Sequence, residues 1–89
     1  MEKFGKGKRT QDFLKMKSSM VLKADDEHRQ KFIEIARNET PTQAYEIAKF
    51  YADKAEDIFP QAEEYAKSCR FLAILKRDYG KESFDEVIV

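Results

Sequence analysis

The 89-residue sequence has little of what breaks regular structure or carries special chemistry: one cysteine, one histidine, three glycines, two prolines and no tryptophan. A single cysteine excludes an intrachain disulfide, and no cysteine–histidine cluster offers a structural zinc site. No apolar run reaches the ~18 residues of a membrane-spanning helix, and no apolar block follows the charged N-terminus as in a secretory signal. We therefore expect a cytoplasmic protein in a reducing setting, with no membrane partner and no cofactor.

The composition predicts one small, helix-rich domain. Hydrophobic residues make up 42% of the chain and charged residues 38%, which is too apolar for a disordered chain and typical of helices with one solvated face. A chain of this length buries only about 60–65% of its unfolded surface, so a core built by one chain alone is marginal.

Charge is unevenly distributed although the net charge is zero. Residues 1–23 hold seven Lys or Arg against two acidic residues, a balance of +5, and the remainder holds ten against fifteen, a balance of −5. This asymmetry predicts a flexible basic N-terminal arm on an acidic body. Thr10 could cap a short helix within the arm, although Ser18 and Ser19 weaken it. Nucleic acid, a phosphate-bearing ligand or a neighbouring subunit would suit the arm as a partner.

Small or apolar residues recur in alternating steps of four and three between Thr40 and Gly80, a spacing that places them on one helix face. The series is Ala44, Ala48, Tyr51, Ala55, Ile58, Ala62, Tyr65, Cys69 and Leu72. Together with the capping signals it predicts an all-α helical domain over residues 24–80, with helices at about 25–38, 41–59 and 60–79. The C-terminal tail, 81–89, is expected to be either a short strand or a segment that docks on a neighbour.

Local signals fix some helix ends better than others. Thr40 is suited to cap a helix, Pro41 to occupy its first position and Gln43 to complete a capping box. Gly80 is typical of a helix C-terminus. Pro60 restricts Phe59 and favours a tight hairpin turn, yet the four–three series continues through it, as in a continuous kinked helix. The sequence leaves both open.

The small residues of the series also bear on assembly. Alanine at a helix contact allows two backbones to approach closely, and the pattern is typical of a contact with another helix. One short chain has few large side chains to cover this face, which favours a homo-oligomer. A monomeric three-helix bundle is the alternative.

No catalytic arrangement is evident, and we expect no enzyme activity. His28 has no converging partners in the sequence and is interpreted as a solvated helix-start residue. Cys69 falls within the four–three series and is interpreted as a packed thiol. The carboxylate pairs are adjacent in sequence, so their side chains diverge on a helix and cannot act as an acid–base couple.

Four side chains are candidates for a ligand-binding site: Tyr45, Lys49, Lys67 and Arg70. A tyrosine ring can stack on a base while lysine and arginine neutralise phosphate, which holds a nucleotide without catalysis. The competing interpretation is that tyrosines fill helix contacts with their hydroxyls at the surface. That interpretation is favoured for the tyrosines within the four–three series, and less strongly for Tyr45, which falls outside it.

The run Pro41-Thr42-Gln43-Ala44-Tyr45-Glu46-Ile47, followed by an alanine-rich helix and Pro60, resembles a family of small phage proteins, the anti-CBASS sponges. The resemblance covers about a third of the chain. It implies a helical hairpin that assembles as a homo-oligomer, binds the host's cyclic GMP-AMP signal between subunits and does not degrade it. No ligand residue is assigned by the resemblance itself.

Two hypotheses follow for function. The first is a phage counter-defence protein in the host cytoplasm that sequesters a cyclic dinucleotide. The second is a small helical regulator whose basic arm engages a host or phage protein or nucleic acid. In the second hypothesis the segment Thr10-Gln11-Asp12-Phe13-Leu14, which loosely resembles a sliding-clamp docking peptide, would be the important one.

Overall fold

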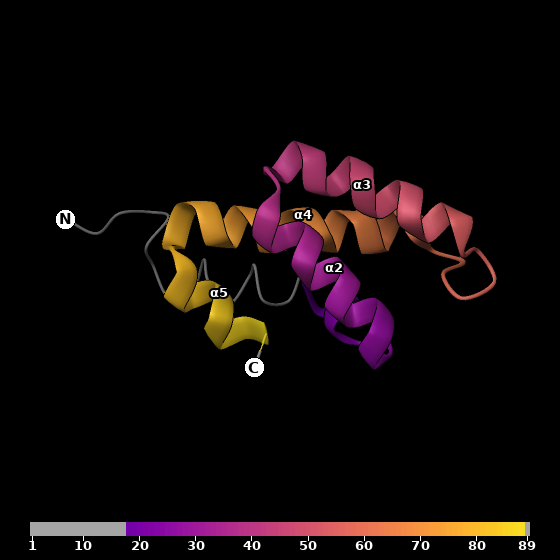
Figure 1. Ribbon diagram of the computed structural model, residues 1–89, viewed down its shortest axis with the longest axis horizontal. Coiled ribbons are helices and arrows are strands. Elements are labelled where there is room, and N and C mark those ends of the chain that lie inside the picture. Colours follow the sequence, from indigo (N-terminus) through magenta and orange to yellow (C-terminus); the bar gives the residue numbers. More distant parts are fainter. Residues whose placement is uncertain (1–17, 89) are drawn as a thin grey trace.

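The computed structural model describes residues 18–88, which fold into a small all-α bundle, as the sequence predicts. Its helices are α2 (Asp26–Asn38), α3 (Pro41–Lys54), α4 (Ala62–Tyr79) and α5 (Lys81–Ile88), preceded by a helical stretch at 18–22. Helices α3 and α4 run side by side, α2 crosses α4 obliquely, and α5 folds back from the end of α4 (Figure 1). None of the helices in this described range has the length and hydropathy needed to cross a bilayer.

Most of the predicted basic arm, residues 1–17, lies outside the described residues. Its last part, from residue 18, is described. Residues 18–22 are helical, and the side chains of Ser18 and Val21 are fully buried. The sequence allowed a short helix within residues 1–23, and in the described part of that segment Val21 joins the helix to the hydrophobic core.

Side-chain caps begin helices α2 and α3. The Asp25 carboxylate accepts a hydrogen bond from the backbone N–H of His28 at 3.1 Å. At α3 the Thr40 hydroxyl oxygen accepts from the N–H of Gln43 at 3.3 Å, and Pro41 occupies the first turn. Each bond satisfies a backbone donor that has no partner inside the helix. The predicted cap at Thr40 is confirmed.

The chain turns tightly before Pro60, so the kinked continuous helix is wrong and the hairpin is right. Helix α3 ends at Lys54, about one turn earlier than the predicted residue 59, and residues 55–58 form turns. The carbonyl oxygen of Ala55 accepts from the N–H groups of both Ile58 and Phe59, each at 2.8 Å. Since Pro60 excludes the helical conformation at Phe59, an earlier exit lets the Phe59 ring turn into the core, where it is 2% exposed.

Alanine faces make the contact between α3 and α4. Ala44, Ala48 and Ala52 on α3 are completely buried, and α4 contributes further small residues to the same core. Those residues are Ala62, Ala66, Cys69 and Ala73. Small side chains on both helices allow a close approach of the two backbones. The hairpin therefore satisfies within one chain a contact for which the sequence pattern favoured a second chain.

Aromatic side chains fill the end of the bundle beside the hairpin turn. Phe32 from α2 stacks on Tyr65 from α4 at a ring-centroid distance of 5.6 Å. Phe59 meets Phe32 at 5.4 Å and Tyr65 at 4.7 Å, both edge to face. These arrangements are the ones that aromatic pairs prefer. Each pair stabilises the fold by about 0.5–1.5 kcal/mol beyond the stabilisation that comes from burying its surface. The turn is thereby attached to both α2 and α4.

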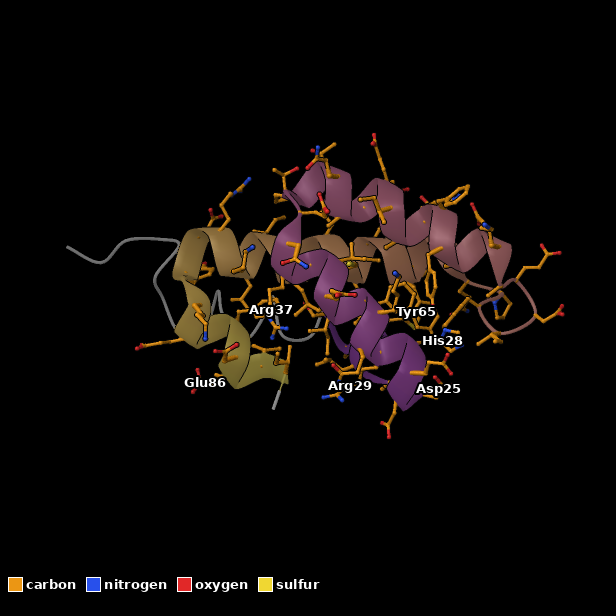
Figure 2. The ribbon with its side chains drawn as sticks, viewed as in Figure 1. Asp25, His28, Arg29, Arg37, Tyr65 and Glu86 are labelled. Carbon is orange, nitrogen blue, oxygen red and sulfur yellow. The ribbon has the colours of Figure 1, made fainter. Side chains whose placement is uncertain are left out.

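The C-terminal tail is a helix, so the prediction of a strand is wrong, and it docks on its own chain. Gly80 has a φ of 98°, which other residues rarely adopt, and it redirects the chain into α5. Phe84 is fully buried beneath the Arg37 guanidinium, which lies 5.3 Å from its ring centroid. Arg29 donates to the carbonyl oxygen of Ile88 at 2.7 Å. Both arginines lie on the side of α2 that faces α5 (Figure 2).

Phe59→Ala should destabilise the protein by about 3–5 kcal/mol, because it removes a buried ring from the aromatic cluster and leaves a cavity. Ile58→Ala is the matched control. Ile58 precedes Phe59 in the same turn and is 51% exposed, so its truncation should change the free energy of unfolding by no more than about 0.5 kcal/mol. Urea denaturation followed by circular dichroism measures both. Equal losses in the two variants would contradict the placement of Phe59 in the core.

Candidate functional site

The four candidate ligand-binding residues come from the two helices of the hairpin. Tyr45 and Lys49 lie on α3, and Lys67 and Arg70 lie on α4. The antiparallel turn brings Tyr45 against Arg70, whose guanidinium carbon lies 5.9 Å from the Tyr45 ring centroid and 5.7 Å from that of Phe71. The arrangement is a cation–π contact between the helices. A tyrosine ring and a cation thus lie together, as a base-stacking site requires.

The two lysines of the site are engaged by carboxylates. The Lys49 ammonium lies 2.9 Å from a carboxylate oxygen of Asp53, and Lys67 lies 3.8 Å from both Glu63 and Glu64. Hydrogen bonding and charge from Asp53 raise the pKa of Lys49, with smaller contributions from Tyr45 and Glu63. The Glu63 carboxylate therefore attracts both Lys49 on α3 and Lys67 on α4 electrostatically. These exposed pairs add little to stability, so a stronger anion can displace them.

Arg70 differs from the lysines because no ion pair forms at its guanidinium within residues 18–88. Its positive charge rests on two aromatic faces, where the planar donors keep their capacity for phosphate or a base edge. Together the four residues supply one ring and three cations, partly neutralised by neighbouring carboxylates; Arg70 is exposed and the other three are half-buried. We call the surface that these residues form the Tyr45–Arg70 face. It can bind an anion with a flat ring.

A second cluster was missed by the sequence analysis. His28 is half-buried, and its Nδ1 lies 2.5 Å from the Tyr51 hydroxyl oxygen, so the interpretation of His28 as a solvated residue is wrong. Burial raises the pKa of Tyr51, with further contributions from the Glu27 and Asp25 carboxylates. No local signal could have revealed the pair, since its members are 23 residues apart and meet only when α2 packs on α3.

Two hollows lie outside the Tyr45–Arg70 face. One of about 540 Å³ runs along α2 beside Tyr51, and its charged lining combines two carboxylates with two cations, without an excess of either sign. The other, of about 350 Å³, lies between the start of α3 and the end of α4. Its cations are occupied, because Lys76 donates to the carbonyl oxygen of Arg37 and Arg77 pairs with Asp78 at 2.8 Å. Neither selects an anion as clearly as the Tyr45–Arg70 face.

The Cys69 thiol lies in the hydrophobic core. No group of three metal-ligating side chains occurs among residues 18–88. The Cys69 thiol is fully buried and donates to the carbonyl oxygen of Phe32 at 3.3 Å. Burial raises the pKa of this thiol to about 12, so it remains protonated at neutral pH. The interpretation of Cys69 as a packed thiol is confirmed.

We compared the chain with known protein families, curated proteins and solved structures. No protein-family model, no curated protein and no solved structure matches the chain. The family resemblance therefore rests on the sequence run from Pro41 to Ile47 and on Pro60.

Cys69 provides a prediction on pH. The folded thiol holds its proton more tightly than the unfolded one, whose pKa is 9.0. Its contribution to stability is therefore complete below about pH 9 and is lost as the pH rises toward 12, by up to about 1.4 kcal/mol per pH unit. Urea denaturation at several alkaline pH values should show this loss in the natural sequence and a smaller one in Cys69→Ala. Parallel curves for the two proteins would contradict the prediction.

Proposed function

We propose that this protein is a non-enzymatic phage counter-defence protein that binds and sequesters a cyclic dinucleotide of the cyclic GMP-AMP type. The observation that carries the proposal is the contact between Tyr45 and Arg70 across the hairpin, with Lys49 and Lys67 on the same two helices. The family resemblance supports the choice of ligand. Stoichiometric binding removes a signal without any catalytic group.

The proposed binding mode uses each residue for one part of the ligand. A base takes the place of the Arg70 guanidinium over the Tyr45 ring, and Arg70, displaced to the edge of the base, donates to that edge or to a phosphate. The ligand has two phosphates, and the face has one lysine on each helix to receive them. Each phosphate takes the place of a carboxylate, Asp53 at Lys49 and Glu63 at Lys67. Binding then exchanges one ion pair for another.

The proposal includes a homo-oligomer in the host cytoplasm. The Tyr45–Arg70 face is accessible on one side, since the side chains of Lys49 and Lys67 are 37% and 45% exposed. A ligand bound there by one chain keeps much of its surface in water. A second subunit placed over the ligand would bury that surface, which supports a site shared between subunits.

Isothermal titration with cyclic GMP-AMP tests the proposal, and the natural sequence should release or absorb heat at micromolar protein. Tyr45→Ala should weaken binding roughly tenfold or more, because base–aromatic stacking contributes about 1–3 kcal/mol. Arg70→Ala should weaken it similarly. Glu63→Gln should instead tighten binding several-fold, because it removes one of the two carboxylates that compete for Lys67.

Lys81→Ala is the matched control. Lys81 forms an i,i+4 pair with Asp85 at 2.8 Å, as Lys49 does with Asp53, but on α5. Its loss should leave the affinity unchanged. Absence of heat with the natural sequence would rule out cyclic GMP-AMP as the ligand, and weakening by Lys81→Ala equal to that by Arg70→Ala would place the site elsewhere.

The alternative function, a regulator acting through its basic arm, depends on residues 1–17 and on the charge asymmetry of the sequence. Deletion of residues 1–17 separates the two functions, and the deletion ends there because Ser18 and Val21 are buried. A sponge should retain its affinity for cyclic GMP-AMP after the deletion. Loss of nucleotide binding in the shortened, still helical protein would favour the arm as the functional element.

A further inference from the structure

The outward face of α3 carries an apolar row that nothing covers within the described chain. Ile47 is 40% exposed and Phe50 is 65% exposed, and Ile58 in the following turn is 51% exposed. The Lys54 ammonium lies 4.9 Å from the Phe50 ring centroid. We call the residues Ile47, Phe50 and Lys54 the α3 ridge. All three large hydrophobic side chains that are exposed in the described chain thus lie on this one helix and the turn that follows it.

The α3 ridge lies away from the face that α3 buries. Ala44, Ala48 and Ala52 are buried against α4, whereas Phe50 lies roughly 160° and Lys54 roughly 120° around the helix from Ala48. The fold therefore gives no internal reason for a phenylalanine at position 50. An external contact gives one, because burying an aromatic ring is a large part of the energy of a protein interface.

The charges of α3 indicate what that contact is. Four charged residues lie on this helix, and two of them, Lys49 and Asp53, pair with each other at 2.9 Å. Glu46 and Lys54 form no ion pair within residues 18–88. These two lie four residues before and four residues after Phe50, so Glu46, Phe50 and Lys54 form one i, i+4 row.

We infer that the α3 ridge is a self-association surface on which a second copy of the chain docks antiparallel, about a two-fold axis at Phe50. In a two-fold interface the same patch meets itself, so each contact occurs twice. The two Phe50 rings meet at the centre. Glu46 of each copy faces Lys54 of the other, because both are equally distant from Phe50. The two unpaired charges of α3 thereby form two ion pairs between the copies.

This arrangement selects a second copy over other occupants. A nucleic acid would meet the Glu46 carboxylate beside the ridge, and a membrane surface would leave that carboxylate without a partner. An antiparallel copy is complementary in both shape and charge without any further assumption. The inference names a surface for the homo-oligomer of the proposed function, but no nucleotide is needed for the contact, so nucleotide binding is tested separately.

A charge exchange in the full-length protein tests the pairing, with molar mass measured by light scattering over a range of concentrations. The natural sequence should shift from monomer to dimer or higher multiples as its concentration rises. Glu46→Lys and Lys54→Glu, made singly, should each weaken association by about tenfold or more, because each places like charges opposite one another twice. The double variant should restore association. Phe50→Asp should abolish it.

Lys49→Asp combined with Asp53→Lys is the matched control, since it exchanges the internal pair of the same helix and should leave the mass unchanged. Circular dichroism verifies that every variant is helical. A monomer at all concentrations overturns the inference, and so does an oligomer that tolerates Phe50→Asp or is not restored by the double variant. Titration with cyclic GMP-AMP is independent of these outcomes, so failure of the interface and failure of the proposed function are distinguishable.

Discussion

The close contact between the alanine faces of α3 and α4 is the constraint on which the rest of the structure depends. Ala44, Ala48 and Ala52 leave no room for large side chains between the helices, so the rings must gather at the end of the hairpin. Phe59 and Tyr65 fill that end together with Phe32 of α2, and they attach the turn to the bundle. A larger side chain in the alanine faces would separate the two helices and, with them, the Tyr45–Arg70 contact.

The sequence predicted those parts of the fold whose causes are local. The cap of α3 involves atoms three residues apart, so Thr40 and Gln43 could be recognised together. The end of α3 has a distant cause, because the chain leaves the helix at Ala55 so that Phe59 can reach rings on α2 and α4. The four–three spacing continues through Pro60 by chance, because α3 has already ended at Lys54 and α4 begins at Ala62. Helix α5 was missed for the same reason, since Arg29 and Arg37 hold it from about 50 residues or more away in sequence.

In the candidate site, too, the sequence predicted what has a local cause and missed what depends on contacts between distant residues. Residue type and helix position were enough to select Tyr45 and Arg70, but their contact exists only because the turn at Pro60 makes the helices antiparallel. The carboxylates near the site pair with Lys49 and Lys67 at i,i+3 and i,i+4 spacing, each within its own helix, so these pairs have local causes. That pairing matters chemically, because the affinity of such a surface for an anion depends on the difference between two ion pairs and not on the number of cations.

The proposed functions of α3 use different sides of the same helix. Tyr45 and Lys49 flank the buried alanines on one side, whereas the α3 ridge lies toward the other, so a copy docked on the ridge leaves the Tyr45–Arg70 face uncovered. Dimerisation through the ridge therefore cannot enclose a ligand by itself. If the ligand lies between subunits, as the family resemblance implies, a second kind of contact must form over the Tyr45–Arg70 face. Two different contacts per chain produce an assembly larger than a dimer, so ligand binding would then depend on assembly beyond the ridge.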